Sequence, residues 1–441
     1  MEIYVYHGQD STKVGVKMEQ EKMAKFNRIF PWYAGLSRDL LFWIAIDTLF
    51  LTVVKNLNAS QIVSLSSISS IVCIVLQIPL LKIIRKIGNT KSVRLSSLLL
   101  LISSLLLTFG QNYVIIALGM IIYEMAFTFQ NMANAVLKNN LELQNKNNEY
   151  IKVKTKSNTI YAIVTMIISF IASLMFNLNS YLPMYGCITI CLICFILSFY
   201  IVDYSKYNKI KEKTKIKSKK KINYNKLIIL LIISYGFFYP IVNSGQSNGK
   251  LFIQQELLLN FDVEKTALII GAILCISRIV RVISNIAFNK IHDKYEEKVG
   301  VILSILLSIS IIFMILGSFV QNSVILKFSI MSLGYIIILF IRDPFKVYMQ
   351  DLALRNVGKE GQQSLLATME LARRIVSTII SLSFTMILAN NSMIIVIVIL
   401  FILSIIGIAI NIKLYKLILV GKKIKSEESN NRNFWANQIK Y

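Results

Sequence analysis

The feature that most constrains this chain is a series of apolar runs, each long enough to cross the roughly 30 Å hydrocarbon core of a bilayer. Inside hydrocarbon no water satisfies backbone N–H and C=O groups, so each run has to form a helix. Of 441 residues, 55% are hydrophobic and 16% are charged, which leaves too few polar side chains to cover water-soluble domains. The sequence therefore predicts an all-α membrane protein. We expect twelve transmembrane helices, near residues 36–55, 60–83, 92–110, 113–137, 158–178, 181–202, 226–252, 265–289, 299–320, 324–345, 363–388 and 392–416.

Short polar breaks separate several of these runs. Asn56–Asn58, Gly110–Asn112 and Asn390-Asn391 are examples. Such breaks leave too little chain for a folded loop, so the helices on either side are expected to be antiparallel neighbours.

The residues before the first run predict a helix that lies at the membrane surface. Phe26, Ile29 and Phe30 fall on one helical face among charged residues. Trp32 and Tyr33 follow, and aromatic side chains of this kind are typical anchors at the level of the lipid headgroups.

The net charge of +25 arises from 48 Lys and Arg against 23 Asp and Glu. The basic residues gather in alternate loops, and a lysine-rich linker follows the sixth run. Because basic loops are retained in the cytoplasm, we expect a multi-pass protein of the cytoplasmic cell membrane with both termini inside. Topology then explains the charge, which removes the argument for nucleic acid as a partner. The linker is expected to be a solvated tether, with contact to anionic lipid as the alternative.

The linker divides the predicted helices into six and six. We expect a cytoplasmic N-terminal segment with the interfacial helix, a first six-helix bundle, the basic cytoplasmic linker, a second six-helix bundle and a cytoplasmic tail. These segments are residues 1–32, 33–203, 204–225, 226–417 and 418–441.

The two halves carry related loops. LLKIIRKIGNTK after the second run is matched by AFNKIHDKYEEK after the eighth. LELQNKNNE at 141–149 is matched by LALRNVGKE at 352–360, about 210 residues later. Similar offsets at two separate loops indicate an internal duplication, which predicts two pseudo-symmetric bundles.

With six plus six helices, a basic central linker and this loop, the chain resembles the major facilitator superfamily of secondary transporters. The family's loop signature is G-x-L-x-D-R-x-G-R-K. Lys86 and Gly88 match it in the first copy, and Asp293 and Lys294 match it in the second. The resemblance implies that the first, fourth, seventh and tenth helices line a central cavity, and that rocking of the halves gives alternating access.

The chain also departs from the family's patterns. In the loop signature, Leu81 and Arg85 replace the leading glycine and the acidic residue of the first copy, and Glu296 replaces a glycine in the second. The glycine-rich stretch with a Gly-Pro pair that marks proton antiporters is missing from the fifth run, NTIYAIVTMIISFIASLMF.

Ionisable residues inside apolar runs are costly, at about 3 kcal/mol or more at the bilayer centre, and are candidates for function. Asp47 lies about halfway along the first run and Glu124 near the middle of the fourth. Burial would raise the proton affinity of such carboxylates, so we expect them to carry a proton or to bind a polar substrate. The alternative is a structural hydrogen bond or ion pair.

The second half carries mainly basic candidates. Arg278 and Arg281 lie one turn apart in the eighth run, with a salt bridge or snorkelling to the surface as alternative roles. Glu370, Arg373 and Arg374 have the spacing of a self-neutralising helix pair. One arginine is left over, and it could pair with Asp47 or Glu124 or meet an anionic substrate.

The seventh run is rich in polar residues and helix breakers. Pro240, Gly245 and Gly249 predict an irregular helix, which is tolerated at membrane depth only where protein or water satisfies the backbone. We expect this segment to border the cavity or to form an outer gate, with packing between helices as the alternative for the tyrosines. The candidate residues are Tyr235, Tyr239, Asn243, Gln246 and Asn248.

Further candidates lie in the fourth and tenth runs. Gln130 is a possible cavity residue near the end of the fourth run. Arg342 and Asp343 stand beside Pro344, which is expected to end or kink the tenth helix at the inner surface. This position predicts an inner gate or hinge, and an ion-paired helix end is the alternative. The same alternatives hold for Arg38 and Asp39 at the start of the first run.

Signatures of enzymes are missing. His7 and His292 are the two histidines, too few for a histidine metal cluster, and the sequence has no Gly-x-Ser-x-Gly, P-loop or Gly-x-Gly-x-x-Gly motif. We therefore expect no catalytic activity, no metal and no cofactor. Energy for transport would come from an ion gradient or from the gradient of the substrate.

The expected function is secondary active transport by a monomer. Proton-coupled export of a small amphiphilic compound is favoured, with that solute, a proton or other coupling ion and membrane lipid as partners. One alternative is uptake of an organic anion or another nutrient. The alternative from another class is a membrane sensor or assembly protein that transports nothing.

Overall fold

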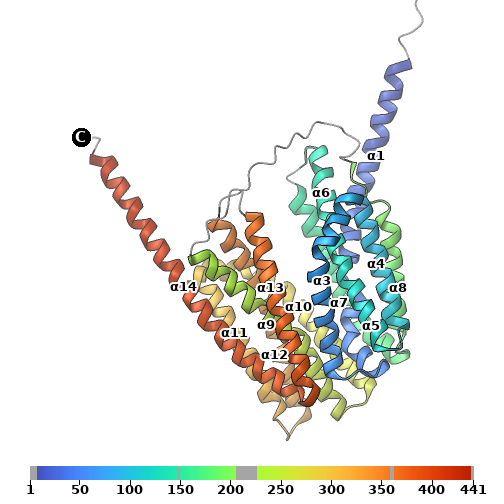
Figure 1. Ribbon diagram of the computed structural model, residues 1–441, viewed down its shortest axis with the longest axis vertical. Coiled ribbons are helices and arrows are strands. Elements are labelled where there is room, and N and C mark those ends of the chain that lie inside the picture. Colours follow the sequence, from blue (N-terminus) through green and yellow to red (C-terminus); the bar gives the residue numbers. More distant parts are fainter. Residues whose placement is uncertain (1–6, 147–148, 205–225, 358–361, 439–441) are drawn as a thin grey trace, which may run out of the picture. The chain divides into compact units, whose positions relative to one another are not determined.

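The computed structural model describes residues 7–146, 149–204, 226–357 and 362–438. Within these ranges all regular elements are helical (Figure 1). The basic linker predicted at 204–225 lies outside the described residues except for Tyr204. In chain order the elements are α1 (His7–Leu36), α2 (Leu41–Leu49), the π-helix η1 (Phe50–Val54), α3 (Ala59–Ile87), α4 (Asn89–Phe109), α5 (Tyr113–Gln130), α6 (Met132–Leu143), α7 (Tyr150–Leu178), α8 (Leu182–Ser198), α9 (Lys226–Asn260), α10 (Val263–Tyr295), the 3-10 helix η4 (Glu296–Lys298), α11 (Val299–Ser318), α12 (Val324–Asn356), α13 (Gln362–Asn390) and α14 (Met393–Gln438).

Each predicted span coincides with a helix. Ten helical segments of the described residues are long and apolar enough to cross a membrane, with α5 and α6 forming one of them. The shorter apolar helix α8 and the α2–η1 segment account for the remaining two predicted spans. The prediction of an all-α membrane protein with twelve spans is confirmed.

Side-chain caps explain why several helices begin at the polar breaks. Asn112 accepts a hydrogen bond from the backbone of Ile115 (2.9 Å) at the start of α5. Asp262 accepts one from the backbone N–H of Lys265 (2.8 Å) at the start of α10, which holds the pKa of Asp262 below its usual range. Such caps satisfy backbone donors that a helix leaves open at its first turn.

The first span differs from its prediction. A break at residues 37–40 separates α1 from α2, within the run expected to be one helix. Phe26, Phe30 and Tyr33 of α1 are fully buried and pack against residues of α4 and α6. Tyr33 also forms a 2.9 Å hydrogen bond with Ser97, so it is a core residue rather than an anchor at the headgroups.

The described chain forms two compact units. Unit 1 takes the described residues of Met1–Leu57, Ile68–Thr214 and Ala267–Cys275, and unit 2 takes those of Asn58–Ser67, Lys215–Thr266 and Ile276–Tyr441. The first turns of α3 group with unit 2, and an early stretch of α10 groups with unit 1. These two stretches begin 209 residues apart (267 − 58), close to the offset between the related loops.

Close packing and hydroxyl contacts explain these two groupings. Within unit 2, Ser67 of α3 donates a hydrogen bond to Ser381 of α13 (2.6 Å), and Ser60 donates to the carbonyl of Thr385 (2.8 Å). Within unit 1, Gly271 of α10 lies so close to Ser173 of α7 that a Cβ atom would overlap the Ser173 hydroxyl.

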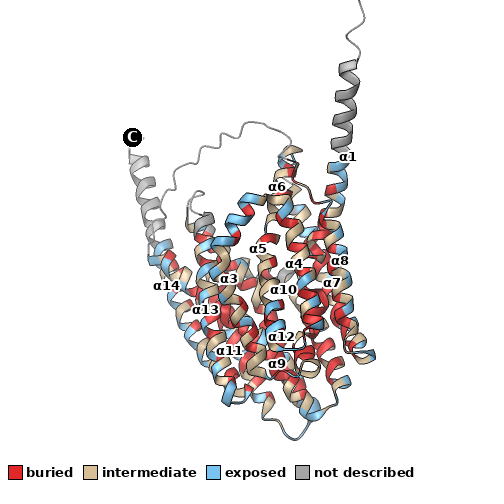
Figure 2. Ribbon diagram, turned by 45° about the vertical axis from the view of Figure 1, so that its right-hand side comes forward, coloured by how far each residue is buried: buried red, intermediate tan, exposed pale blue. Residues whose placement is uncertain are grey.

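Helix α9 is the central element of unit 2 and packs against α12, α13 and α14. Buried residues line the inner faces of each unit, whereas large apolar side chains such as Val75 and Ile78 of α3 are exposed (Figure 2). This distribution is expected for helices whose outer faces meet lipid. A helix surface is in apolar surroundings whether it faces lipid or another helix. Small residues and polar contacts therefore have to specify which helices associate.

The prediction that α9 is irregular is wrong, because α9 runs without a break from Lys226 to Asn260. Its glycines serve close packing instead. A Cβ atom at Gly249 would lie 2.9 Å from Met314 of α11, and one at Gly236 would lie 2.9 Å from Ala372 of α13. Neighbouring helices can hold a transmembrane helix together around a proline such as Pro240.

Helix α12 also continues past the proline that was expected to end or kink it. Pro344 lies inside the helix, which ends at Asn356. The helix therefore continues 11 residues beyond 345, where this span was predicted to end.

The tight contact between α11 and α12 predicts the effect of a single added methyl group. In Gly334→Ala the new Cβ would overlap the carbonyl oxygen of Ser310, a backbone atom that cannot turn away. We expect a loss of about 1–3 kcal/mol of stability and a melting temperature lower by several degrees in detergent. Gly421→Ala is the matched control, since a Cβ there meets nothing within 4 Å. Equal melting temperatures for the two variants would contradict the packing argument.

Candidate functional site

The acidic candidates lie in unit 1. Asp47 is on α2, one helical turn before η1, and its carboxylate accepts a 2.7 Å hydrogen bond from the backbone of Thr48. Glu124 is on α5 and is partly buried. The two side chains lie on separate helices, which is compatible with proton transfer as well as with a structural role.

A second polar set in unit 1 surrounds the break between α1 and α2. Asp39 accepts hydrogen bonds from the Tyr123 hydroxyl and from the backbone of Leu40 (3.0 Å). The guanidinium of Arg38 donates to Asn158 (2.8 Å) and lies 4.6 Å from the ring centre of Tyr161. The break is thus bound to α5 and α7.

Gln130, expected to line a cavity, contributes to the same region. Its amide donates to the carbonyl oxygen of Ser37 and lies 3.1 Å from the Ser37 hydroxyl. It therefore satisfies a carbonyl group at the C-terminal end of α1.

The most extensive set of charged side chains described here is centred on Glu370 of α13, in unit 2. The Tyr235 hydroxyl donates to Oε1 of Glu370 at 2.8 Å, and Arg373 Nε donates to Oε2 at 2.6 Å. Lys346 Nζ lies 3.7 Å from Oε1. We call Tyr235, Tyr239, Lys346, Glu370 and Arg373 the Glu370 cluster. It joins side chains of α9, α12 and α13.

Two tyrosines form the aromatic side of the Glu370 cluster. The rings of Tyr235 and Tyr239 are stacked, with centres 5.3 Å apart and planes 13° apart. Arg373 and Lys346 lie 5.8 and 5.9 Å from the centre of the Tyr239 ring, at the outer limit of a cation–π contact. The stacked pair is buried, with Tyr235 0% and Tyr239 4% exposed, and it lies beside the two cations.

The charged members of the Glu370 cluster carry more positive than negative charge and are partly exposed, whereas its two tyrosines are buried. Lys346 and Arg373 contribute two positive charges and Glu370 one negative charge. The side chains of Lys346, Glu370 and Arg373 are 39%, 32% and 22% exposed. A charge at this depth is too costly to face lipid, so these groups have to face protein or a hydrated space.

Sequence reasoning identified only part of the Glu370 cluster. It paired Glu370 with Arg373 through their helical spacing, and it selected both tyrosines. It missed Lys346 because the tenth span was expected to end at residue 345. It also assigned Glu370 a structural role, since the partners on α9 and α12 are remote in the sequence.

The basic and acidic candidates of α10 and α12 form separate contacts. Arg281 binds Asp343 through two hydrogen bonds of 2.5 and 3.0 Å, so this pair is the salt bridge considered for Arg281. Arg342 donates to Gln246 of α9 at 2.6 Å. Arg278 lies one turn before Arg281 and is 8% exposed.

The remaining candidates are dispersed. Asn248 is buried in α9, and Asn243 is half-buried with no hydrogen-bond partner for Oδ1 among the described residues. Arg374 is half-buried beside Arg373.

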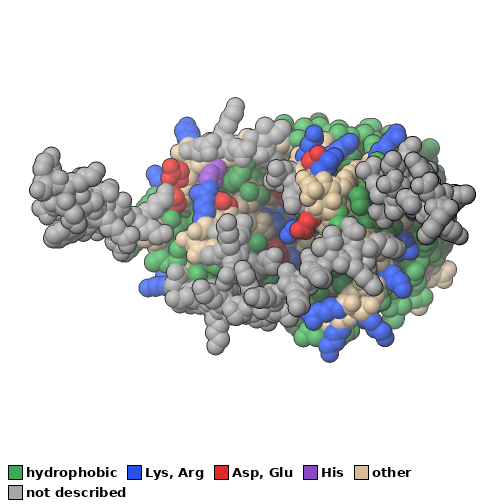
Figure 3. Space-filling view, turned by 90° about the horizontal axis from the view of Figure 1, so that it is seen from above, with side chains coloured by type: hydrophobic (Ala, Val, Ile, Leu, Met, Phe, Trp, Pro, Cys, Tyr) green, Lys and Arg blue, Asp and Glu red, His purple; other side chains and the backbone are tan. Residues whose placement is uncertain are grey.

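The loop motif is exposed where it is described. Gly88 adopts a φ of 79°, a left-handed conformation that favours glycine at this place in the signature. Lys86 and Lys294 are exposed, and the side chain of Asp293 lies outside the described part of the chain. Figure 3 shows Lys and Arg side chains, together with fewer acidic ones, on one face of the molecule.

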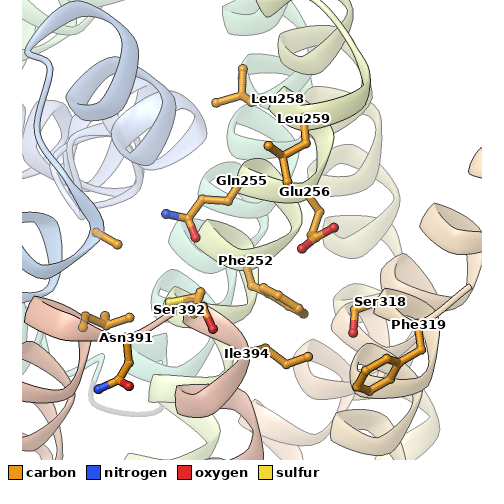
Figure 4. A pocket seen from close by; sticks show the side chains of 13 residues that line it. Phe252, Gln255, Glu256, Leu258, Leu259, Ser318, Phe319, Asn391, Ser392 and Ile394 are labelled. Atoms are coloured by element: carbon orange, nitrogen blue, oxygen red, sulfur yellow. The ribbon is translucent and has the colours of Figure 1, made fainter. Parts of the chain in front are cut away.

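Two cavities in unit 2 lie away from the Glu370 cluster. One, of about 600 Å³, is lined by Phe252, Gln255, Glu256 and residues at the ends of α11, α13 and α14 (Figure 4). Glu256 in its wall forms a 2.5 Å ion pair with Lys327. The other, of about 320 Å³, lies beside η4 between His292 and Tyr348. Within the described residues, no group of three or more His, Cys, Asp or Glu side chains is arranged to hold a metal ion.

Several solved structures share this fold. A bacterial homologue of the iron transporter ferroportin, in an inward-facing state, aligns with a TM-score of 0.68 over 89% of this chain and 99% of its own, at 12% identity. The nucleoside transporter NupG aligns with a TM-score of 0.64 over 89% and 99%, at 13% identity. A bacterial homologue of the lysosomal transporter Spinster aligns with a TM-score of 0.63 over 90% and 97%, at 9% identity. At these identities the likeness concerns the fold alone.

No curated protein matches the sequence. The family model described as Major Facilitator Superfamily, in contrast, matches residues 32–381, which is most of the chain. That match includes the loop motif and the whole Glu370 cluster. The chain therefore belongs to the major facilitator superfamily of transporters.

Proposed function

We propose that the protein is a secondary active transporter for a small organic anion with an aromatic or apolar body, and that it works by alternating access. Its family and fold are those of transporters rather than enzymes. The observation that carries the choice of substrate is the positive excess of the Glu370 cluster.

The cations of the Glu370 cluster suit a carboxylate or a similar group. Arg373 offers a planar guanidinium, which matches the geometry of carboxylates and phosphates, and Lys346 adds a mobile point charge. Glu370 uses Nε of Arg373, and the guanidinium carries further N–H donors. A bound anion would therefore find charge and donors together.

The stacked tyrosines support an amphiphilic substrate. Both rings are buried next to the charged groups, so an aromatic or apolar body would pack on them once movement of the helices during alternating access uncovers them. This combination favours the organic anion, which the sequence left as an alternative, over an uncharged amphiphile.

Proton-coupled export of a small amphiphilic compound is the second candidate. It is supported by the carboxylates of unit 1, Asp47 and Glu124, which would bind and release protons as their surroundings change. Because these groups are negative, this candidate suits a cationic or neutral substrate.

We further propose that the transporter is a monomer in the cytoplasmic cell membrane with both termini in the cytoplasm. The placement is supported by the basic loops, since positive residues are retained on that side of the bilayer. Contact between the linker and anionic lipid stays a prediction.

The anion proposal predicts which compounds stabilise the purified protein. Aromatic carboxylates such as benzoate should raise the melting temperature by a few degrees at saturating concentration, because they bind only the folded state. Benzamide and benzylamine should not. Arg373→Gln should remove the shift, whereas Arg355→Gln, which alters an exposed pair with Asp351, should keep it. Stabilisation by benzylamine alone would reject the proposal.

The second candidate predicts the effect of neutralising the acidic residues. Asp47→Asn or Glu124→Gln should abolish accumulation of the substrate driven by a pH gradient in liposomes, because the proton carrier is gone. Exchange without a gradient should persist in the folded variants. Asp262→Asn is the control, since asparagine also caps helices and Asp262 lies at the exposed start of α10. Full gradient-driven transport by both variants at neutral pH would exclude the second candidate.

A further inference from the structure

We infer that the carboxylate of Glu370 is a built-in competitor of the transported anion, and that one proton bound to Glu370 accompanies each anion. This inference rests on the proposed anion transport. It adds a named residue for coupling and makes the transporter a proton–anion symporter.

The geometry shows that Glu370 occupies the groups an anion would need. Its two oxygens bind Arg373 Nε at 2.6 Å and the Tyr235 hydroxyl at 2.8 Å, and Lys346 Nζ is 3.7 Å away. These are the donors that a substrate carboxylate would use beside the tyrosine pair. Glu370 and a bound anion therefore compete for the same partners and repel each other.

Protonation removes both obstacles. A proton from water adds to one Glu370 oxygen and forms a neutral carboxylic acid, so the ion pairs with Arg373 and Lys346 are lost. The two cations are then free to bind the anion, and the acid group can donate a hydrogen bond to it. No covalent bond other than the O–H bond forms or breaks.

The charges of the Glu370 cluster then favour two states. With Glu370 ionised and no substrate, the sum is +1, from Lys346 and Arg373 against Glu370. With a proton and a monovalent anion bound, the sum is again +1. With only the proton bound, the net charge of the cluster is +2. With only the anion bound, the net charge is 0 and two carboxylates are in contact. Loading both ions together thus avoids the charge imbalance of either ion alone.

The charged groups around Glu370 are those that the proposed competition requires. The helices packed against α13 include α9, α12 and α14. The titratable or charged groups that face Glu370 are Tyr235 from α9, Lys346 from α12 and Arg373 from α13 itself, and the described part of α14 adds none. The proton on Glu370 therefore binds beside the two cations that the anion also binds.

The coupling has a direction. If anion and proton move together, a proton gradient directed into the cell drives the anion inward. Binding of one ion strengthens binding of the other by the same factor, because linkage is reciprocal. The inference accordingly favours uptake.

Binding of benzoate at different pH values tests the inference. In the intact protein, the benzoate dissociation constant measured by calorimetry should rise about tenfold per pH unit once Glu370 is ionised, with one proton taken up per benzoate. Glu370→Gln should bind benzoate with the low-pH affinity at every pH between 5 and 8, and without proton uptake. Glu256→Gln is the matched control: it removes a carboxylate from the Lys327 pair in the same unit, and it should keep the pH dependence.

A second measurement keeps the test decisive if Glu370→Gln does not fold. In the intact protein at pH 8, the heat of benzoate binding should vary with the ionisation heat of the buffer as expected for one proton taken up per benzoate. Binding without proton uptake would overturn the role of Glu370.

The outcomes separate the inference from the proposed function. Benzoate binding that is independent of pH in the intact protein and weaker in Glu370→Gln would reject the competition and leave anion transport standing. Absence of benzoate binding by the intact protein at both pH 5 and pH 8 would reject the anion site itself, and with it both proposals.

Discussion

The structure depends on the cost of leaving a polar group without a partner in hydrocarbon. That cost makes every spanning segment a helix, and it also decides where polar side chains can be placed. Many serines of the described helices donate to a carbonyl of their own helix, as Ser169 does to Thr165. Others donate to a neighbouring helix, as Ser96 does to Ala126 and Ser103 to Gly119, both at 2.9 Å. The charged residues of unit 2 follow the same rule, because Arg281 is bound to Asp343 and Arg373 to Glu370. The Glu370 cluster differs from these neutral pairs because it retains a net positive charge.

Most of the fold could be predicted from the sequence because the signal is local. An apolar run long enough to cross the bilayer has to be a helix, and a short polar break has to be its end. The errors arose where the deciding contacts are remote. Tyr33 is buried by Val93 and Ser97 of another helix, so its position could not be distinguished from a surface anchor. The glycines of α9 looked like breaks because Met314 and Ala372, which need the space, lie far along the chain.

The candidate site was predicted in parts for the same reason. The spacing of Glu370 and Arg373 predicts a pair within one helix, and the pair is present. Side chains of α9 and α12 also contact that pair on α13. These helices are remote in the sequence, so residue spacing could not predict the contacts. Lys346 shows how an error in one boundary spreads to function. Placing the end of α12 before this residue moved it out of the membrane, although the helix continues to Asn356.

The break between α1 and α2 has a consequence for the surrounding lipid. Together α2 and η1 have 14 residues (9 + 5), which at 1.5 Å per residue extend only about 21 Å. This is less than the roughly 30 Å thickness of the hydrocarbon layer, so a hydrophobic mismatch results. Either the bilayer thins beside this segment or the polar turn with Arg38 and Asp39 enters the acyl region. Both responses change with acyl-chain length, which makes the conformational energy of unit 1 sensitive to membrane thickness.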